Sequence, residues 1–136
     1  MALIIDTSVL ITLERRDLLL ESLRPFMDFD EPLAISSMTI SELLIGMLRA
    51  DSSRRQARRR IFIDGLLARV PILSFDLPSA VIHASIQDQL MAEGQIIGHN
   101  DLIIASTALA NDFDLLTDNV REFQRVPGLT VRQPVW

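Results

Sequence analysis

Short, wholly apolar runs alternate along this chain with longer amphipathic segments. The apolar runs predict buried strands at 2–5, 33–36, 71–75, 115–117 and 130–132. Apolar residues at helical spacing predict helices at 9–14, 17–29, 37–49, 54–67, 77–93, 101–110 and 120–123. Because strands and helices alternate, we expect an α/β fold of three layers, with a central, mainly parallel sheet of four to five strands and helices on both faces.

Composition narrows the chemistry that such a fold can carry. The 136 residues are 49% hydrophobic, which suits one domain over residues 1–136 with a sizeable core. Cysteine is absent, which excludes disulfides, cysteine-bound zinc, iron–sulfur clusters and thiol nucleophiles. Lysine is absent as well, which excludes P-loop phosphate binding and Schiff-base chemistry.

The chain carries no predicted signal for export or membrane insertion. The segment Met1–Asp6 has no basic region and meets an acid after a short apolar run, unlike a signal peptide. No apolar run approaches the roughly 20 residues that span a bilayer. We therefore expect a cytoplasmic protein that does not bind membranes.

Charge is unevenly distributed. The net charge of −5 argues against nucleic-acid binding driven by overall charge, but it does not exclude an acidic site filled by divalent cations. Five of the thirteen basic residues fall within residues 54–60, and all thirteen are arginine. This run is either a solvated helix face or a patch that contacts phosphate, a task to which arginine is suited. The candidate contacts are Arg54, Arg55, Arg58 and Arg59.

Four carboxylates occupy positions that can meet at one edge of the sheet. Asp6 and Asp118 follow predicted strands, Glu42 lies early in a helix, and Asp101 stands in the first turn of a largely apolar helix for which Asn100 is a candidate N-cap. Each has a local alternative. Asp6 would cap a helix, Asp118 would form an Asx turn, and Glu42 would complete a capping box with Thr39. Asp101 needs hydrogen-bond donors or a metal ion.

One shared cause is simpler than four separate ones. Clustered carboxylates repel one another, and Mg²⁺ or Mn²⁺, which prefer oxygen ligands, would relieve that repulsion. Gly46 lies one turn after Glu42 on the same helix face and predicts the close approach of another backbone there. The residues alone thus predict a metal-dependent acidic site that acts on phosphate. The role of His99, beside Asp101, stays open.

Taken together, four stretches and the end of the chain make a more specific pattern. It resembles the PIN-domain ribonucleases, and within them the VapC toxins of type II toxin–antitoxin pairs. The matching stretches are Ile5-Asp6-Thr7-Ser8, Ser37-Met38-Thr39-Ile40-Ser41-Glu42-Leu43 with Gly46, Asn100-Asp101-x-x-Ile104-Ala105, Leu116-Thr117-Asp118-Asn119-Val120-Arg121-x-Phe123 and Val126-Pro127-Gly128-Leu129.

The resemblance implies a Mg²⁺-dependent endoribonuclease, with Mn²⁺ as a substitute, that hydrolyses structured RNA such as tRNA or rRNA. It also implies a homodimer and a cognate antitoxin that blocks the acidic pocket. By resemblance, the catalytic and metal-binding residues are Asp6, Glu42, Asp101 and Asp118, with Asp114 as a substitute for Asp118. Thr7 or Ser8 would be a polar neighbour of the site.

Two other classes of function remain compatible with the residues themselves. The same metal site could serve a phosphoesterase or nuclease with another substrate. A non-catalytic, receiver-like α/β binding module also places acids at strand ends, although such modules use a lysine that this chain lacks.

Overall fold

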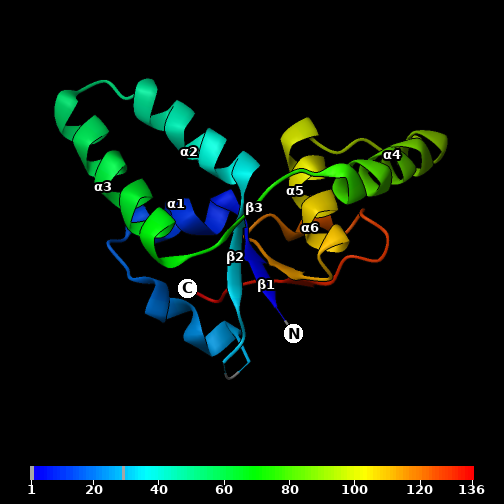
Figure 1. The fold of residues 1–136 in the computed structure, drawn as a ribbon, viewed down its shortest axis with the longest axis horizontal. Coiled ribbons are helices and arrows are strands. Elements are labelled where there is room, and N and C mark those ends of the chain that lie inside the picture. Colours follow the sequence, from blue (N-terminus) through cyan, green and yellow to red (C-terminus); the bar gives the residue numbers. More distant parts are fainter. Residues whose placement is uncertain (1, 29) are drawn as a thin grey trace.

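The fold is built on one five-stranded sheet. A computed structural model describes residues 2–28 and 30–136. The strands are all parallel and lie in the spatial order β3-β2-β1-β4-β5 (Figure 1). Their bounds are β1 Leu3–Ile5, β2 Leu33–Ser36, β3 Ile72–Leu73, β4 Asp114–Leu116 and β5 Val131–Arg132. The predicted α/β fold with a parallel sheet is confirmed.

The chain builds this sheet outwards from β1 in two directions. Leu3 of β1 pairs with Leu33 of β2 on one side and with Asp114 of β4 on the other. The order of strands therefore reverses between β1 and β4. In parallel sheets such a reversal opens a crevice at the carboxyl ends of the two strands, where ligands bind.

Helices cover both faces of the sheet. On one side lie α1, α2 and α3, and on the other lie α4, α5 and α6 (Figure 1). Their bounds are α1 Thr7–Arg15, α2 Ser37–Leu48, α3 Ser53–Arg69, α4 Leu77–Ala92, α5 His99–Ala110 and α6 Val120–Phe123, with a 3-10 helix, η1, at Leu20–Phe26. Within the described ranges, no helix has the length and apolar character needed to cross a membrane.

Strand β1 forms part of two separate cores. Leu3 and Ile5 are fully buried in the core shared with α1, α2 and α3, whereas Ile4 is fully buried in the core shared with α4, α5 and α6. Side chains alternate between the faces of a strand, so a wholly apolar run is needed where both faces are covered. This explains why the first strand has no polar residue before Asp6.

Two predicted boundaries are wrong. The helix expected over 17–29 is only the short 3-10 helix Leu20–Phe26, and Phe29 lies outside the described residues. Asp17 adopts a positive φ of 55°, which turns the chain, and Pro25 cannot donate a backbone hydrogen bond to a longer α-helix. Helix α5 begins at His99 after Gly98, so Asn100 lies inside its first turn and is not the N-cap.

Gly46 makes room for a side chain and not for the backbone that the sequence suggested. A Cβ atom at Gly46 would lie 2.6 Å from Nη1 of Arg59. Arg59 crosses this gap from α3, donates to both carboxylate oxygens of Glu14 at 2.9 Å and donates to the carbonyl oxygen of Leu43 at 3.1 Å. One arginine therefore ties α3 to both α1 and α2.

A second arginine holds the opposite, amino-terminal end of the sheet. Arg132 of β5 donates to both oxygens of Glu31, at 2.7 and 2.8 Å, and to Oδ2 of Asp114 at 2.7 Å. The Glu31 side chain is completely buried. Its hydrogen bonds with Arg132 lower the pKa of Glu31, so the glutamate stays charged and needs its partner.

We expect Arg132→Met to destabilise the protein by about 3 kcal/mol, because it leaves the buried Glu31 carboxylate without its counter-charge. Urea unfolding followed by circular dichroism measures the change. Arg121→Met, at an exposed arginine of α6, is the matched control and should cost less than about 0.5 kcal/mol. An equally small loss for Arg132→Met would show that the network contributes no more than a surface ion pair.

Candidate functional site

Asp6 lies at the carboxyl end of β1 and is only 3% exposed. Its Oδ2 accepts hydrogen bonds from the hydroxyl groups of Ser8, at 2.8 Å, and Thr117, at 2.7 Å. Its Oδ1 has no hydrogen-bond partner in residues 2–28 and 30–136. Asp6 occupies the N-cap position of α1 but its side chain does not cap that helix. The carboxylate is therefore fixed on one side and available on the other.

Ser8 and Thr117 extend this arrangement across the crevice between β1 and β4. The backbone N–H of Asp118 donates to the Ser8 hydroxyl at 3.1 Å, and the backbone N–H of Asn119 donates to Oγ1 of Thr117 at 2.9 Å. The predicted polar neighbour Ser8 thus contacts Asp6 directly. Its hydroxyl group also fixes the turn that follows β4.

Glu42 is held by the other predicted neighbour, Thr7. The Thr7 hydroxyl donates to Oε1 of Glu42 at 2.7 Å and lies 3.0 Å from the Thr39 hydroxyl. The capping box with Thr39 does not form, because α2 begins after Ser36, whose own hydroxyl accepts from the N–H of Met38. The Glu42 carboxylate is directed towards the start of α1 instead.

Asp101 is half-buried near the start of α5. Burial, followed by its hydrogen bond with Glu122, raises the pKa of Asp101 from 3.8 to about 7. The negative charges of Asp6 and Glu42 also raise this pKa. The three predicted acids Asp6, Glu42 and Asp101 therefore influence one another electrostatically, as members of one cluster do.

Glu122 is the residue that the sequence analysis missed. The backbone N–H of Gly98 donates to its Oε1 at 2.6 Å and lowers the pKa of Glu122, while Asn119 donates to its Oε2 at 2.9 Å. A Cβ atom at Gly98 would lie 3.3 Å from Glu122 and 3.5 Å from Asp101. The available signal was an acid in the first turn of the short helix that follows Thr117.

Asp118 lies beside the cluster, but its carboxylate has other partners. Its Oδ1 accepts from the indole N–H of Trp136 at 2.8 Å, and its Oδ2 accepts from the Thr12 hydroxyl at 3.2 Å. It forms no side-chain cap on α6, so the predicted Asx turn is absent. A direct role for Asp118 in the site stays a prediction. Asp114 lies at the amino end of β4, paired with Arg132, and cannot take its place.

His99 and the arginine run contribute little to this edge. The ring of His99 packs edge-to-face on His83 of α4, with 6.2 Å between centroids. Arg59 is committed to Glu14, and Arg58 donates to the Glu14 carbonyl oxygen at 3.2 Å. Arg55 pairs with Asp51 at 3.4 Å, and Arg54 lies exposed on the same helix. Arg58 and Arg59 therefore lie at the far end of α1 and not at the acidic cluster.

The acidic cluster fits a divalent cation chemically without being closed around one. Carboxylate oxygens are the ligands that Mg²⁺ and Mn²⁺ prefer, and a cation would relieve the repulsion from Asp6 and Glu42, which adds to the effect of burial in raising the pKa of Asp101. In the part of the chain that the structure describes, however, no three acids or histidines already stand in a metal-holding arrangement. Side-chain movement would have to accompany binding.

Comparison with known proteins decides the family. The model of the PIN domain matches residues 3–129. The chain belongs to the PIN-domain family. It is 34% identical over 131 residues to a protein named Ribonuclease VapC from Rickettsia bellii, a match that covers 96% of this chain and 95% of that protein. The expected resemblance to VapC proteins is confirmed.

Two further relatives extend this result. A tRNA(fMet)-specific endonuclease VapC from Salmonella typhimurium is 31% identical over 99 residues, which are 73% of each chain. In the crystal structure of VapBC2 from Rickettsia felis bound to a promoter DNA fragment, one chain superposes with a TM-score of 0.86 at 27% identity. The superposition covers 99% of this chain and all of that one. Fold and sequence therefore place this PIN domain with the VapC proteins.

The buried position of Asp101 gives a testable dependence of stability on pH. Its folded pKa of about 7 exceeds its unfolded value, so between about pH 4 and 7 the folded protein holds a proton that the unfolded chain releases. Stability without metal should therefore fall as pH rises through this range. Asp101→Asn should raise the free energy of unfolding by about 1 kcal/mol at pH 8 and much less at pH 4, a modest gain because the side chain is only partly buried.

Urea unfolding in EDTA at both pH values measures this effect. Asp88→Asn, at an exposed aspartate of α4, is the control and should change the free energy of unfolding little at either pH. If Asp101→Asn destabilised the protein equally at pH 4 and pH 8, the folded protein would not raise the pKa of Asp101.

Proposed function

We propose that this PIN domain is a metal-dependent endoribonuclease and the toxin of a type II toxin–antitoxin pair. The observation that carries the proposal is the cluster of Asp6, Glu42, Asp101 and Glu122 at the strand-order reversal of a fold shared with VapC ribonucleases. Membership of this family favours the proposal over the receiver-like binding module that the sequence left open.

Asp6, Glu42 and Asp101 would hold Mg²⁺ or Mn²⁺, with Glu122 beside Asp101 and Asp118 as the outermost acid. The cation supplies Lewis-acid activation of water and of the phosphodiester when it is bound. Ser8 and Thr117 orient Asp6, and Thr7 orients Glu42. Without the cation, Glu122 accepts a hydrogen bond from the protonated carboxyl group of Asp101 and so holds that group in place.

The proposed substrate is a structured RNA, either a tRNA or an rRNA loop. Support comes from the Salmonella typhimurium relative, whose name specifies tRNA(fMet). Among the arginines first considered as RNA contacts, Arg54, Arg55 and Arg58 have a nitrogen free to meet phosphate, whereas Arg59 is bound on three sides. A nuclease that acts on such RNA would work in the cytoplasm.

A cognate antitoxin and a second copy of the chain are the proposed protein partners. The VapBC2 complex from Rickettsia felis supports the antitoxin, since a toxin–antitoxin pair crystallised together contains the matching fold. Exposed apolar side chains on α4, including Leu77 at 77% and Val81 at 62%, supply surface that a homodimer would cover.

The decisive experiment is RNA cleavage by the purified protein without antitoxin. We expect cleavage of tRNA(fMet) or of a ribosomal RNA fragment with Mg²⁺ or Mn²⁺, none with EDTA, and none by Asp101→Asn. Gel analysis of end-labelled RNA measures the rate and locates the cut. Cleavage that persists in EDTA, or full activity in Asp101→Asn, would contradict the proposed mechanism.

The roles of Glu122 and Asp118 separate in the same assay. Glu122→Gln should lower kcat by about 10- to 100-fold, because Glu122 contacts Asp101 directly. Asp118→Asn should lower kcat less than about tenfold, since an amide oxygen still accepts one of its two hydrogen bonds. A larger loss of kcat in Asp118→Asn than in Glu122→Gln would identify Asp118 as the fourth catalytic acid and Glu122 as a supporting residue.

A further inference from the structure

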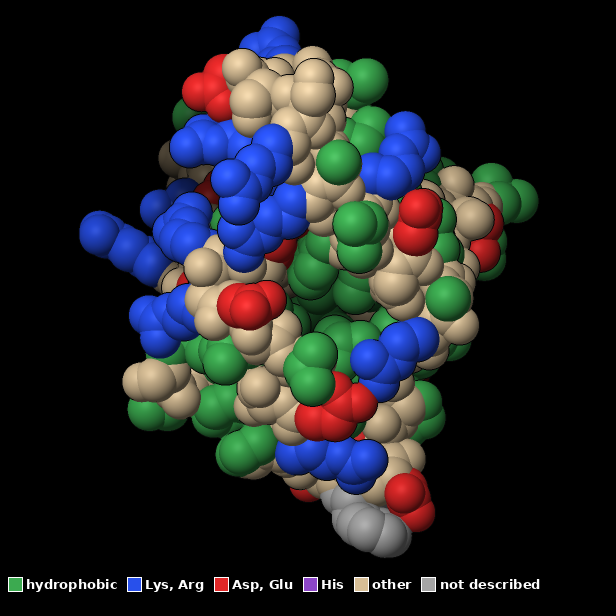
Figure 2. All heavy atoms as spheres, turned by 90° about the vertical axis from the view of Figure 1, so that its left-hand side faces the viewer, with side chains coloured by type: hydrophobic (Ala, Val, Ile, Leu, Met, Phe, Trp, Pro, Cys, Tyr) green, Lys and Arg blue, Asp and Glu red, His purple; other side chains and the backbone are tan. Residues whose placement is uncertain are grey.

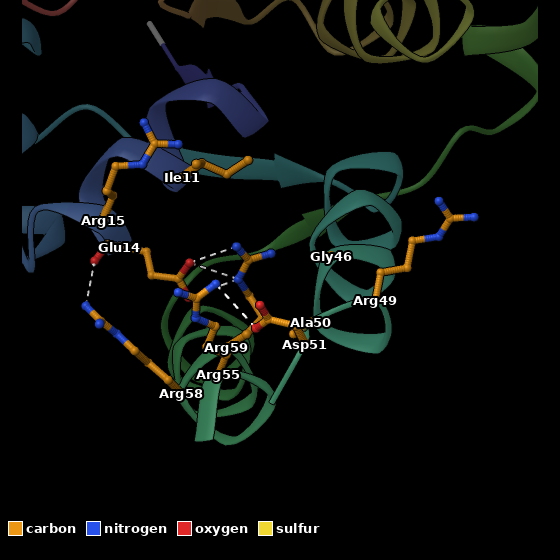
Figure 3. Close-up of a pocket in the computed structure, with 10 residues that line it drawn as sticks. All are labelled: Ile11, Glu14, Arg15, Gly46, Arg49, Ala50, Asp51, Arg55, Arg58 and Arg59. Carbon is orange, nitrogen blue, oxygen red and sulfur yellow. Dashed lines mark hydrogen bonds and ion pairs between the residues drawn. The ribbon is translucent and has the colours of Figure 1, made fainter. Parts of the chain in front are cut away.

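A cavity of about 630 Å³ lies where α1, α2 and α3 meet. Five arginines line it: Arg15 from α1, Arg49 just after α2, and Arg55, Arg58 and Arg59 from α3 (Figure 3). The acids in its wall are Glu14 and Asp51. Positive charge therefore exceeds negative charge here, in a chain whose net charge is −5.

The arginines of this cavity divide into structural and free cations. Arg59 is fixed by Glu14 and by the Leu43 carbonyl, and only 19% of its side chain is exposed. The side chains of Arg15 and Arg49 are exposed and have no hydrogen-bond or ion-pair partner among residues 2–28 and 30–136. In Figure 3 both extend away from the Glu14–Arg59 contact, one on each side of the cavity.

The face that carries α2 and α3 shows the same distribution. In Figure 2 arginine side chains gather around a hollow whose floor is hydrophobic. Ile11 contributes apolar surface to the cavity. An anion that entered it would meet cations at the rim and lose water at the floor, which strengthens charge pairing.

The cavity is aligned with the acidic cluster. Helix α1 begins there, where Thr7 bonds to Glu42 in the middle of α2, and both helices end at the cavity. Arg15 lies eight residues after Thr7, and Arg49 lies seven residues after Glu42. At about 1.5 Å per residue, each arginine stands roughly 10–12 Å along its helix from that bond. An extended strand only a few nucleotides long could reach both places.

We propose that this cavity binds the phosphodiester backbone of the RNA strand that is cut, with Arg15 and Arg49 as its principal contacts. The inference rests on the proposed ribonuclease function and adds the path of the substrate to it. Arginine forks bind phosphate oxygens in pairs, and Arg55 can join them because its ion pair with Asp51 is largely exposed. Because the cavity lies within a few nucleotides' length of the acidic cluster where RNA would be cut, we favour a nucleic-acid strand over an acidic protein segment as its occupant.

The test measures RNA binding in an Asp101→Asn background, so that no RNA is cut. The probes are fluorescein-labelled tRNA(fMet) and a 12-residue oligouridylate, titrated by anisotropy between 50 and 200 mM salt. Adding Arg15→Gln and Arg49→Gln together should reduce the slope of log K against log salt by about 1.4, the value for two lost phosphate contacts on a single strand. Affinity should fall by a similar factor for both RNAs, because phosphate contacts carry no sequence information.

Arg60→Gln in the same background is the matched control. Arg60 lies on α3 and is exposed, but it does not line the cavity. The slope of log K against log salt for this variant should therefore equal that of Asp101→Asn alone. Unchanged slopes for the double variant would overturn the inference, as would a loss of antitoxin affinity without a loss of RNA affinity. In either case, metal-dependent RNA cleavage by the wild-type protein would leave the ribonuclease proposal standing. No binding and no cleavage by any form would overturn both.

Discussion

The buried carboxylate of Asp6 is the constraint on which the rest of this structure depends. A carboxylate so deeply enclosed needs hydrogen-bond donors, and those of Oδ2 come from two places, Ser8 at the start of α1 and Thr117 just after β4. Satisfying Asp6 therefore requires β1 and β4 to end level with each other. That requirement fixes the crevice between them, and with it the positions of α1 and of the turn after β4.

Around Asp6 the protein separates two kinds of charge. Acids lie at the beginnings of α1, α5 and α6 and in the middle of α2, while arginines gather at the far ends of α1 and α2 and along α3. Burial, the hydrogen bond with Glu122 and the neighbouring acids raise the pKa of Asp101, whereas Arg59 is neutralised by Glu14 and Arg55 pairs with Asp51. The molecule can be overall acidic and still offer a cationic path to its acidic edge.

The sequence predicts the strands well because wholly apolar runs leave few alternatives in a sheet covered on both faces. It also places Asp6, Glu42 and Asp101 at one edge, since the carboxyl ends of parallel strands and the helices that follow them meet there. The sequence does not predict Glu122 as a member of the cluster, because its contacts are with the Gly98 N–H and Asp101, which are distant along the chain. The hydrogen-bond partners of Asp118 are not predicted for the same reason, since Thr12 and Trp136 are distant from it along the chain and contact it only in the folded protein.

Gly46 has a consequence for how relatives of this chain can vary. Its missing side chain is filled by the guanidinium of Arg59, which in turn neutralises Glu14. We therefore expect these three positions, which lie on three different helices, to vary together among relatives. A relative with a larger residue at position 46 should also lack the arginine at 59, and one without that arginine should have no carboxylate at 14. Substitution at one position alone would disturb the junction of α1, α2 and α3.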